Sequence, residues 1–266
     1  MTAAGPEAGT FLQGQLSQDV VALAPGTSAW SWVLAPNGKV DALVRVTRRS
    51  DDEWLLDTDG GWGPALLARL NRFKLRTKVD LELQSWRALG LRGGETVPAL
   101  EGVTARFDWP TLAGVDVFGQ APEVPDEWPL LSGEDYEAER IVAGVPKLGA
   151  ELTDKTIPAE TGLVGEQAVS FTKGCYTGQE LVARIDSRGG HVARHLCVLR
   201  LPARVEPATE LVDAAGKPAG SVTSVASSSR RGWVGLGYVR RGVEVPGTLH
   251  AGTDGPLVEV GDLPGW

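Results

Sequence analysis

The sequence predicts an α+β fold in which a mixed helix and sheet region over residues 1–190 is followed by a small C-terminal β-barrel over residues 191–266. Up to Gly190, apolar residues recur with both helical and strand spacing. Beyond Gly190, short apolar runs are separated by Gly, Pro and Asp, which is typical of small barrels and sandwiches. We therefore expect the main domain boundary near Gly190.

The elements of the first region are predicted from apolar spacing and turn residues. Asn37-Gly38 lies between two apolar runs, which is a strong hairpin signal. Pro64 suits the first turn of a helix. The expected order is a helix at 11–20, hairpin strands at 29–34 and 40–47, a strand at 54–58, a helix from Pro64 to Phe73 and a strand at 79–83.

The elements from residue 90 onward are predicted from the same signals. Short strands and loops are expected over 90–126, where Gly and Pro are frequent. A helix is expected at 135–143, because Ser132 and Asp135 have capping-box spacing and Gly144 follows. A second helix is expected around 181–185, after a strand end near Val169. Barrel strands are expected at 196–201, 220–225, 233–239 and 257–260.

Composition restricts the class of protein. The chain has 266 residues, 42% of them hydrophobic, and a formal net charge of −8, which disfavours stable binding to nucleic acid. Neither a secretory signal nor an apolar run of membrane-spanning length is visible, so the cytoplasm is the expected location and no membrane partner is expected. The 2 Cys exclude a disulfide framework and a four-thiolate metal site.

The segment from Lys173 to Glu180 combines a turn, a thiol and a helix start. Gly174 and Gly178 permit sharp turns, and the apolar spacing that follows is helical. Cys175 would lie near the helix N-terminus beside Lys173, and both features favour a thiolate. By residue type alone, a lone cysteine in a cytosolic protein is more often an inert small hydrophobe than a reactive thiol.

This segment, Lys-Gly-Cys-Tyr-Thr-Gly-Gln-Glu, resembles the K-G-C-Y-x-G-Q-E signature of the YgfZ family. Further segments resemble the same family in the same order. They are residues 11–20, residues 37–41, Arg140 with residues 144–146, residues 158–160, residues 182–184 and residues 220–224.

The resemblance implies a fold shared with the T-protein of glycine cleavage, an aminomethyltransferase. In that fold two intertwined subdomains and a barrel surround a central funnel that holds tetrahydrofolate or a one-carbon derivative. It also implies an accessory role in the assembly or repair of iron–sulfur clusters, with iron–sulfur proteins or assembly factors as transient partners. The implied catalytic residues are Cys175, Lys173 and Asp41, and the implied cofactor-binding residues are Gly174, Tyr176, Gly178, Gln179, Glu180, Arg140 and Glu160.

Two departures from the T-protein pattern weaken the transferase alternative. Ala42 replaces one of a pair of aspartates, and Val142 replaces a pterin-contacting glutamate. Aminomethyl transfer, with Asp41 orienting the amine, stays open as one alternative, and a non-enzymatic scaffold that binds a protein partner is another. His191, His195 and Cys197 are close in sequence but enter a strand, where they would be spread out, so no metal site is assigned.

Overall fold

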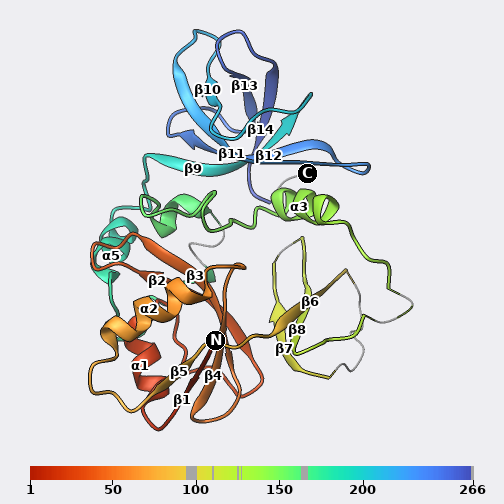
Figure 1. Cartoon of the computed structure of the whole chain (residues 1–266). Helices are drawn as coiled ribbons and strands as arrows, with labels where there is room; N and C mark the ends of the chain where they lie inside the picture. The colour runs from red at the N-terminus through yellow and green to blue at the C-terminus, as the bar shows by residue number, and fades with distance from the viewer. Residues whose placement is uncertain (94–100, 110, 125, 127, 163–166, 265–266) are drawn as a thin grey trace.

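The protein is described by a computed structural model over residues 1–93, 101–109, 111–124, 126, 128–162 and 167–264. It has three parts: a five-stranded sheet with two helices, a three-stranded sheet, and a closed six-stranded barrel (Figure 1). All strand pairs are antiparallel. The predicted α+β fold with a C-terminal barrel is therefore confirmed.

The five-stranded sheet has the order β2-β3-β4-β1-β5. Its strands are β1 (Thr2–Ala4), β2 (Ser28–Leu34), β3 (Val40–Arg48), β4 (Glu53–Asp57) and β5 (Asp80–Glu82). The predicted hairpin is present as β2 and β3, and Gly38 in its turn has a φ of +80°. Strand β1, which was not predicted, lies between β4 and β5.

Two helices accompany this sheet, α1 (Ala8–Gln15) and α2 (Gly63–Lys74). The predicted end of the first helix at residue 20 is wrong. Leu16 is already extended, with φ −111° and ψ 146°. Ser17 then pairs with Trp32 of β2 through its backbone N–H and its hydroxyl, so the chain joins the sheet edge instead of continuing the helix. Helix α2 begins at Gly63, one residue before the predicted start, and Pro64 lies in its first turn.

The three-stranded sheet contains β6 (Arg87–Arg92), β7 (Val103–Phe107) and β8 (Gly114–Gly119), in the order β6-β8-β7. Residues 94–100 of the predicted strand-and-loop stretch lie outside the described residues. Helix α3 (Gly133–Val142) follows, and the Ser132 hydroxyl accepts a hydrogen bond from the backbone N–H of Asp135, as predicted. A short 3-10 helix, η1 (Pro158–Thr161), and helix α5 (Gln179–Ser187) complete the link to the barrel.

The barrel closes in the order β10-β11-β12-β9-β14-β13. Its strands are β9 (Arg194–Leu201), β10 (Glu210–Val212), β11 (Pro218–Ser228), β12 (Gly232–Arg240), β13 (Gly247–Ala251) and β14 (Leu257–Gly261). All four predicted barrel strands are present, and β10 and β13 were not predicted.

Helix α3 packs on β11 and β12, so it lies between the barrel and the three-stranded sheet (Figure 1). A cluster of apolar residues that includes Ile141, Val142 and Leu236 fills the contact between this helix and the barrel. The three parts thereby face a common centre. Within the described residues, none of the helices has the length and apolar character needed to cross a membrane.

Candidate functional site

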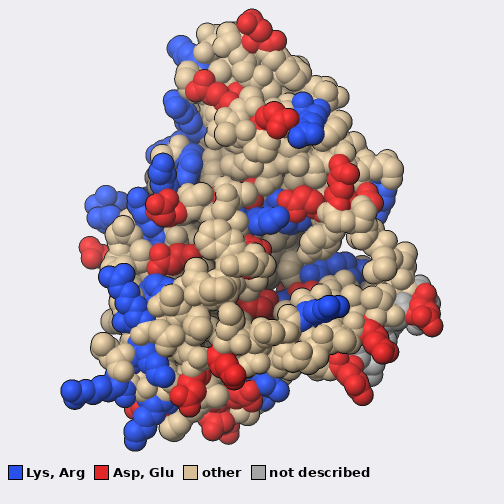
Figure 2. All heavy atoms as spheres, viewed as in Figure 1, with Lys and Arg blue, Asp and Glu red and all other residues tan. Residues whose placement is uncertain are grey.

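A central cavity of about 780 Å³ lies where the three parts meet. Its walls come from the middle of β3, the end of β4, from β6 and β8, and from α3 with the segment that follows it. The space-filling view shows this hollow, with acidic and basic side chains on its surface (Figure 2). Aromatic side chains form much of the remaining wall. They are Trp30, Phe107, Phe118, Trp128 and Tyr136.

Largely buried ion pairs between arginines and aspartates line the side of the cavity formed by the two sheets. Arg45 is only 2% exposed, and its guanidinium donates to Asp57 at 2.8 and 3.2 Å and contacts Asp116 at 2.8 Å. Arg92 contacts the other oxygen of Asp116 at 2.7 Å and stacks on the Phe107 ring at 4.0 Å. The buried Nε of Arg92 has no hydrogen-bond partner among the described residues. This wall therefore combines aromatic faces with fixed charges and a spare donor.

Asp59 presents a carboxylate to the same cavity. One of its oxygens accepts a hydrogen bond from the backbone N–H of Leu148 at 2.7 Å, and the other has no partner among the described residues. Burial raises the pKa of Asp59, while the Leu148 hydrogen bond and the positive charge of Arg140 act in the opposite direction. A ligand that donates an N–H could therefore bind to the spare oxygen.

Arg140 lines the cavity but belongs mainly to a buried network. It donates to both carboxylate oxygens of Glu137 at 2.8 and 3.0 Å, to the Val145 carbonyl, and to Glu151 at 3.3 Å. Glu151 also accepts hydrogen bonds from hydroxyl groups of the barrel. Four of the five guanidinium N–H groups can be satisfied in this way, so Arg140 acts first as a fixed positive charge behind the cavity wall.

The signature segment forms a loop that is anchored to α1. The ammonium group of Lys173 donates to the carbonyls of Gln13, Leu16 and Gln18 at 2.7, 2.7 and 2.9 Å. Burial lowers the pKa of Lys173 to about 8, against the opposing charge of Asp19. Lys173 therefore satisfies the carbonyls where α1 ends, and these three contacts occupy its donors.

The same loop is locked to the hairpin turn. Gly178 precedes α5 with a φ of +82°, and a Cβ there would stand 2.5 Å from the Ala35 carbonyl oxygen. A Cβ on Gly38 would stand 2.4 Å from the Cβ of Leu181 in α5. The Gln179 side chain closes the loop by accepting from the Tyr176 N–H at 3.0 Å. The glycines are needed because the hairpin and the loop meet backbone to backbone.

Cys175 lies at the exposed tip of this loop, whereas Cys197 is buried in the barrel. Burial, with a smaller contribution from Asp262, raises the pKa of Cys197 to about 12. Cys175 precedes the N-terminus of α5, as the sequence predicts, but its neighbour Lys173 points to α1 carbonyls. Among the predicted site residues that the structure describes, Arg140 alone lines the central cavity.

The remaining predicted residues lie elsewhere. Asp41 forms an ion pair with Arg69 of α2 at 2.7 Å. Glu160 is 7% exposed and pairs with Arg194 of β9 at 3.0 Å. Gly174 and Glu180 are exposed in the loop and in the first turn of α5. In the part of the chain that the structure describes, no group of three His, Cys, Asp or Glu side chains could hold a metal ion.

Asp57, Asp59, Arg45 and Arg92 were not singled out from the sequence. The available signal was the pair of aspartates two residues apart at the end of β4, followed by Gly60-Gly61. Such a pair at a strand end places both side chains on one face of the sheet. The arginines gave no comparable signal, because a charged residue on a strand is usually solvated.

No family model matches the chain. It is 32% identical over 190 residues to an uncharacterised protein of Haemophilus influenzae, covering 70% of this chain and 65% of that protein. It is 27% identical over 209 residues to the tRNA-modifying protein YgfZ of Aliivibrio fischeri, covering 71% of this chain and 64% of that protein. The chain thus spans slightly less than two thirds of the length of these two relatives.

A longer match is to the mitochondrial iron-sulfur cluster assembly factor IBA57 of Mus musculus. It has 28% identity over an alignment of 306 positions, covering 98% of this chain and 81% of that protein. Among solved structures, the crystal structure of glycine cleavage system aminomethyltransferase T from Bartonella henselae matches with a TM-score of 0.74 and 19% identity. That match covers 99% of this chain and 82% of the other, and it shows a shared fold.

Proposed function

The chain belongs to the YgfZ family, and on that basis we propose that it binds a reduced folate in its central cavity and supports iron–sulfur proteins. The folate would be tetrahydrofolate or a one-carbon derivative. The protein would act as an accessory factor in the assembly or repair of iron–sulfur clusters and in the maturation of the enzymes that carry them. The name of the IBA57 relative supports the second half of the proposal.

The single observation that carries folate binding is the Asp59 carboxylate among the aromatic walls of the central cavity. A pterin is a flat heterocycle that presents adjacent N–H donors, and it needs a carboxylate partner and aromatic faces. Val142 has an aliphatic side chain that cannot provide that carboxylate, and it is buried between α3 and the barrel. Asp59 has the required spare oxygen on the cavity surface. We therefore assign to Asp59 the role of the pterin-anchoring carboxylate.

The rim of the cavity suits the anionic tail of a folate. Lys147 and Arg230 line the cavity with side chains that are 49% and 78% exposed. Among the described residues, each makes one loose ion pair, at 3.8 Å to Glu137 and 3.7 Å to Glu139 respectively. Exposed cations with weak partners can turn to a ligand carboxylate at little cost. Their contribution should weaken as salt concentration rises.

Cys175 is proposed to act on a partner protein instead of on the pterin. Its thiol is exposed at a loop tip, and the loop is held rigid by Lys173 and Gly178. An exposed cysteine on a fixed loop can serve as a transient thiolate ligand, a sulfur acceptor or a one-carbon acceptor. The transferase alternative gains no support from Asp41, since Arg69 holds that carboxylate in an ion pair.

Calorimetric titration with 5-formyl-tetrahydrofolate, a form that resists oxidation, tests the folate site. Asp59→Asn should weaken binding at least about tenfold, because a charge-assisted hydrogen bond to the pterin is lost. Asn can still accept the Leu148 N–H, so the fold is kept. Asp41→Asn is the matched control and should bind like the wild type. Wild-type affinity in Asp59→Asn would reject the assigned anchor, and an absence of heat in the wild type would reject folate binding.

Complementation tests the role of Cys175. In a bacterial strain that lacks its own YgfZ, the wild-type chain should restore iron–sulfur enzyme activity, and Cys175→Ser should not. Cys197→Ser serves as the control, because that thiol is buried in the barrel. Full restoration by Cys175→Ser would exclude a chemical role for the thiol.

A further inference from the structure

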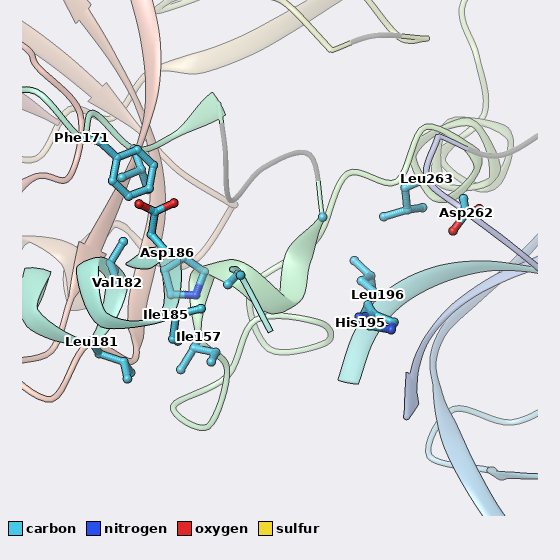
Figure 3. A pocket seen from close by; sticks show the side chains of 15 residues that line it. Ile157, Phe171, Leu181, Val182, Ile185, Asp186, His195, Leu196, Asp262 and Leu263 are labelled. Atoms are coloured by element: carbon cyan, nitrogen blue, oxygen red, sulfur yellow. The ribbon is translucent and has the colours of Figure 1, made fainter. Parts of the chain in front are cut away.

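A second cavity, of about 490 Å³, lies between helix α5 and the barrel. It is bounded by α5, by η1, by β9 of the barrel and by the segment after β14. Its walls are largely aliphatic, and their side chains come from separate elements that face one another (Figure 3). Leu181, Val182 and Ile185 of α5 form one wall, and Ile157, Leu196 and Leu263 form the others.

Phe171 and Asp186 stand together at one end of this apolar cavity. Phe171 is 57% exposed although it is a large aromatic side chain. Figure 3 shows the Asp186 carboxylate beside the Phe171 ring. The carboxylate has no hydrogen bond or ion pair with any side chain or backbone group that the structure describes. An aromatic face next to an unpaired carboxylate is the arrangement that binds organic ammonium groups.

The remaining polar side chains of the described lining are a second carboxylate and a histidine. Asp262 lies on the opposite side, beside Leu263, and it too lacks a side-chain partner among the described residues (Figure 3). His195 of β9 also lines the cavity. Lysine and arginine are absent from the described lining, whereas the central cavity has both at its rim. The charged side chains of the second cavity's described lining are therefore carboxylates, whereas the central cavity carries charges of both signs.

We propose that this second cavity binds a small organic cation that has an apolar body and a protonated amine. The amine would lie between Asp186 and Phe171, and the body would fill the space between α5 and Leu196. The volume is within the usual range for small-ligand sites, roughly 300–1,000 Å³. A folate fits poorly, because its tail carboxylates would face Asp186 and Asp262. The inference does not depend on folate binding in the central cavity.

Titration with phenethylammonium tests the proposal, with phenethyl alcohol and 3-phenylpropionate as neutral and anionic analogues of similar shape. We expect phenethylammonium to bind about tenfold more tightly than the alcohol, and the propionate not to bind. Binding can be followed by calorimetry and by shifts of the methyl signals of the cavity leucines and isoleucines.

Variants then locate the site. Asp186→Asn should weaken phenethylammonium binding about tenfold, and Phe171→Leu should weaken it by a smaller factor, since the apolar contact stays and the π face is lost. Asp254→Asn, in an exposed turn of the barrel, is the control and should leave binding unchanged. Equal affinity for the ammonium and the alcohol would overturn the proposal. So would unchanged binding in Asp186→Asn, or no binding by the wild type at millimolar ligand.

Discussion

Glu151→Gln should lower the free energy of unfolding by about 3 kcal/mol. The Glu151 side chain is fully buried, and one of its oxygens accepts from the hydroxyls of Thr223 and Ser224 at 2.7 and 2.6 Å. The other oxygen accepts from the Lys147 N–H at 3.0 Å and from Arg140 at 3.3 Å. Glutamine can keep the first pair of bonds, but its amide nitrogen would then face two donors. The loss is one ordinary hydrogen bond, about 1 kcal/mol, and one to a charged group, about 2 kcal/mol.

Urea unfolding followed by tryptophan fluorescence measures this effect. With a denaturant slope of about 3 kcal/mol per molar, the midpoint should fall by about 1 M. Glu206→Gln is the control, because Glu206 and its partner Arg204 are both largely exposed, and it should change stability by less than about 0.5 kcal/mol. A loss below about 1 kcal/mol in Glu151→Gln would refute the reasoning that the buried pair is a stabilising link between α3 and the barrel.

Three further outcomes are expected. Gly178→Ala should destabilise the protein by about 3 kcal/mol through the left-handed φ and backbone clash, whereas Gly174→Ala, which meets nothing within 4 Å, should leave the melting temperature almost unchanged. Burial raises the pKa of Tyr176 to about 12, so above pH 10 the tyrosine of the unfolded chain loses its proton before that of the folded chain, and the free energy of unfolding should decrease. In urea titrations at pH 10–12, Tyr176→Phe should show a smaller decrease of the free energy of unfolding than the wild type. Iodoacetamide at pH 8 should alkylate Cys175 and leave Cys197 intact by mass spectrometry, and equal labelling of both would contradict the burial of the second thiol.

Local chemistry explains which elements the sequence could predict. The Asn37-Gly38 hairpin, the helix with Pro64 in its first turn and the Ser132 cap each depend on a few adjacent residues, and all three were predicted. Strands β1 and β10 have three residues each, which is too short for an alternating pattern to be recognised. The end of α1 depends on Ser17, whose hydroxyl donates to the Ala168 carbonyl far away in the sequence.

The same distinction between local and long-range interactions decides which parts of the candidate site could be predicted. The segment around Cys175 could be located from its residues, because its turn and helix are local, and the structure places α5 directly after it. The central cavity could not, because Arg45 comes from β3, Asp59 from the segment after β4, and Arg92 from β6 of the other sheet. Each is an unremarkable charged residue in its own segment, and only tertiary packing brings them to one surface.

The contact between Gly38 and α5 limits where the chain can be lengthened or labelled. Pro36 and Asn37 are exposed in a tight turn, and such positions are the usual choice for inserting a tag or a fluorescent reporter. Here an insertion would push the turn against Leu181 and move the loop that carries the exposed thiol. The barrel turn at Ala214 offers a better position, because it is exposed and the neighbouring Gly216 has open space around it.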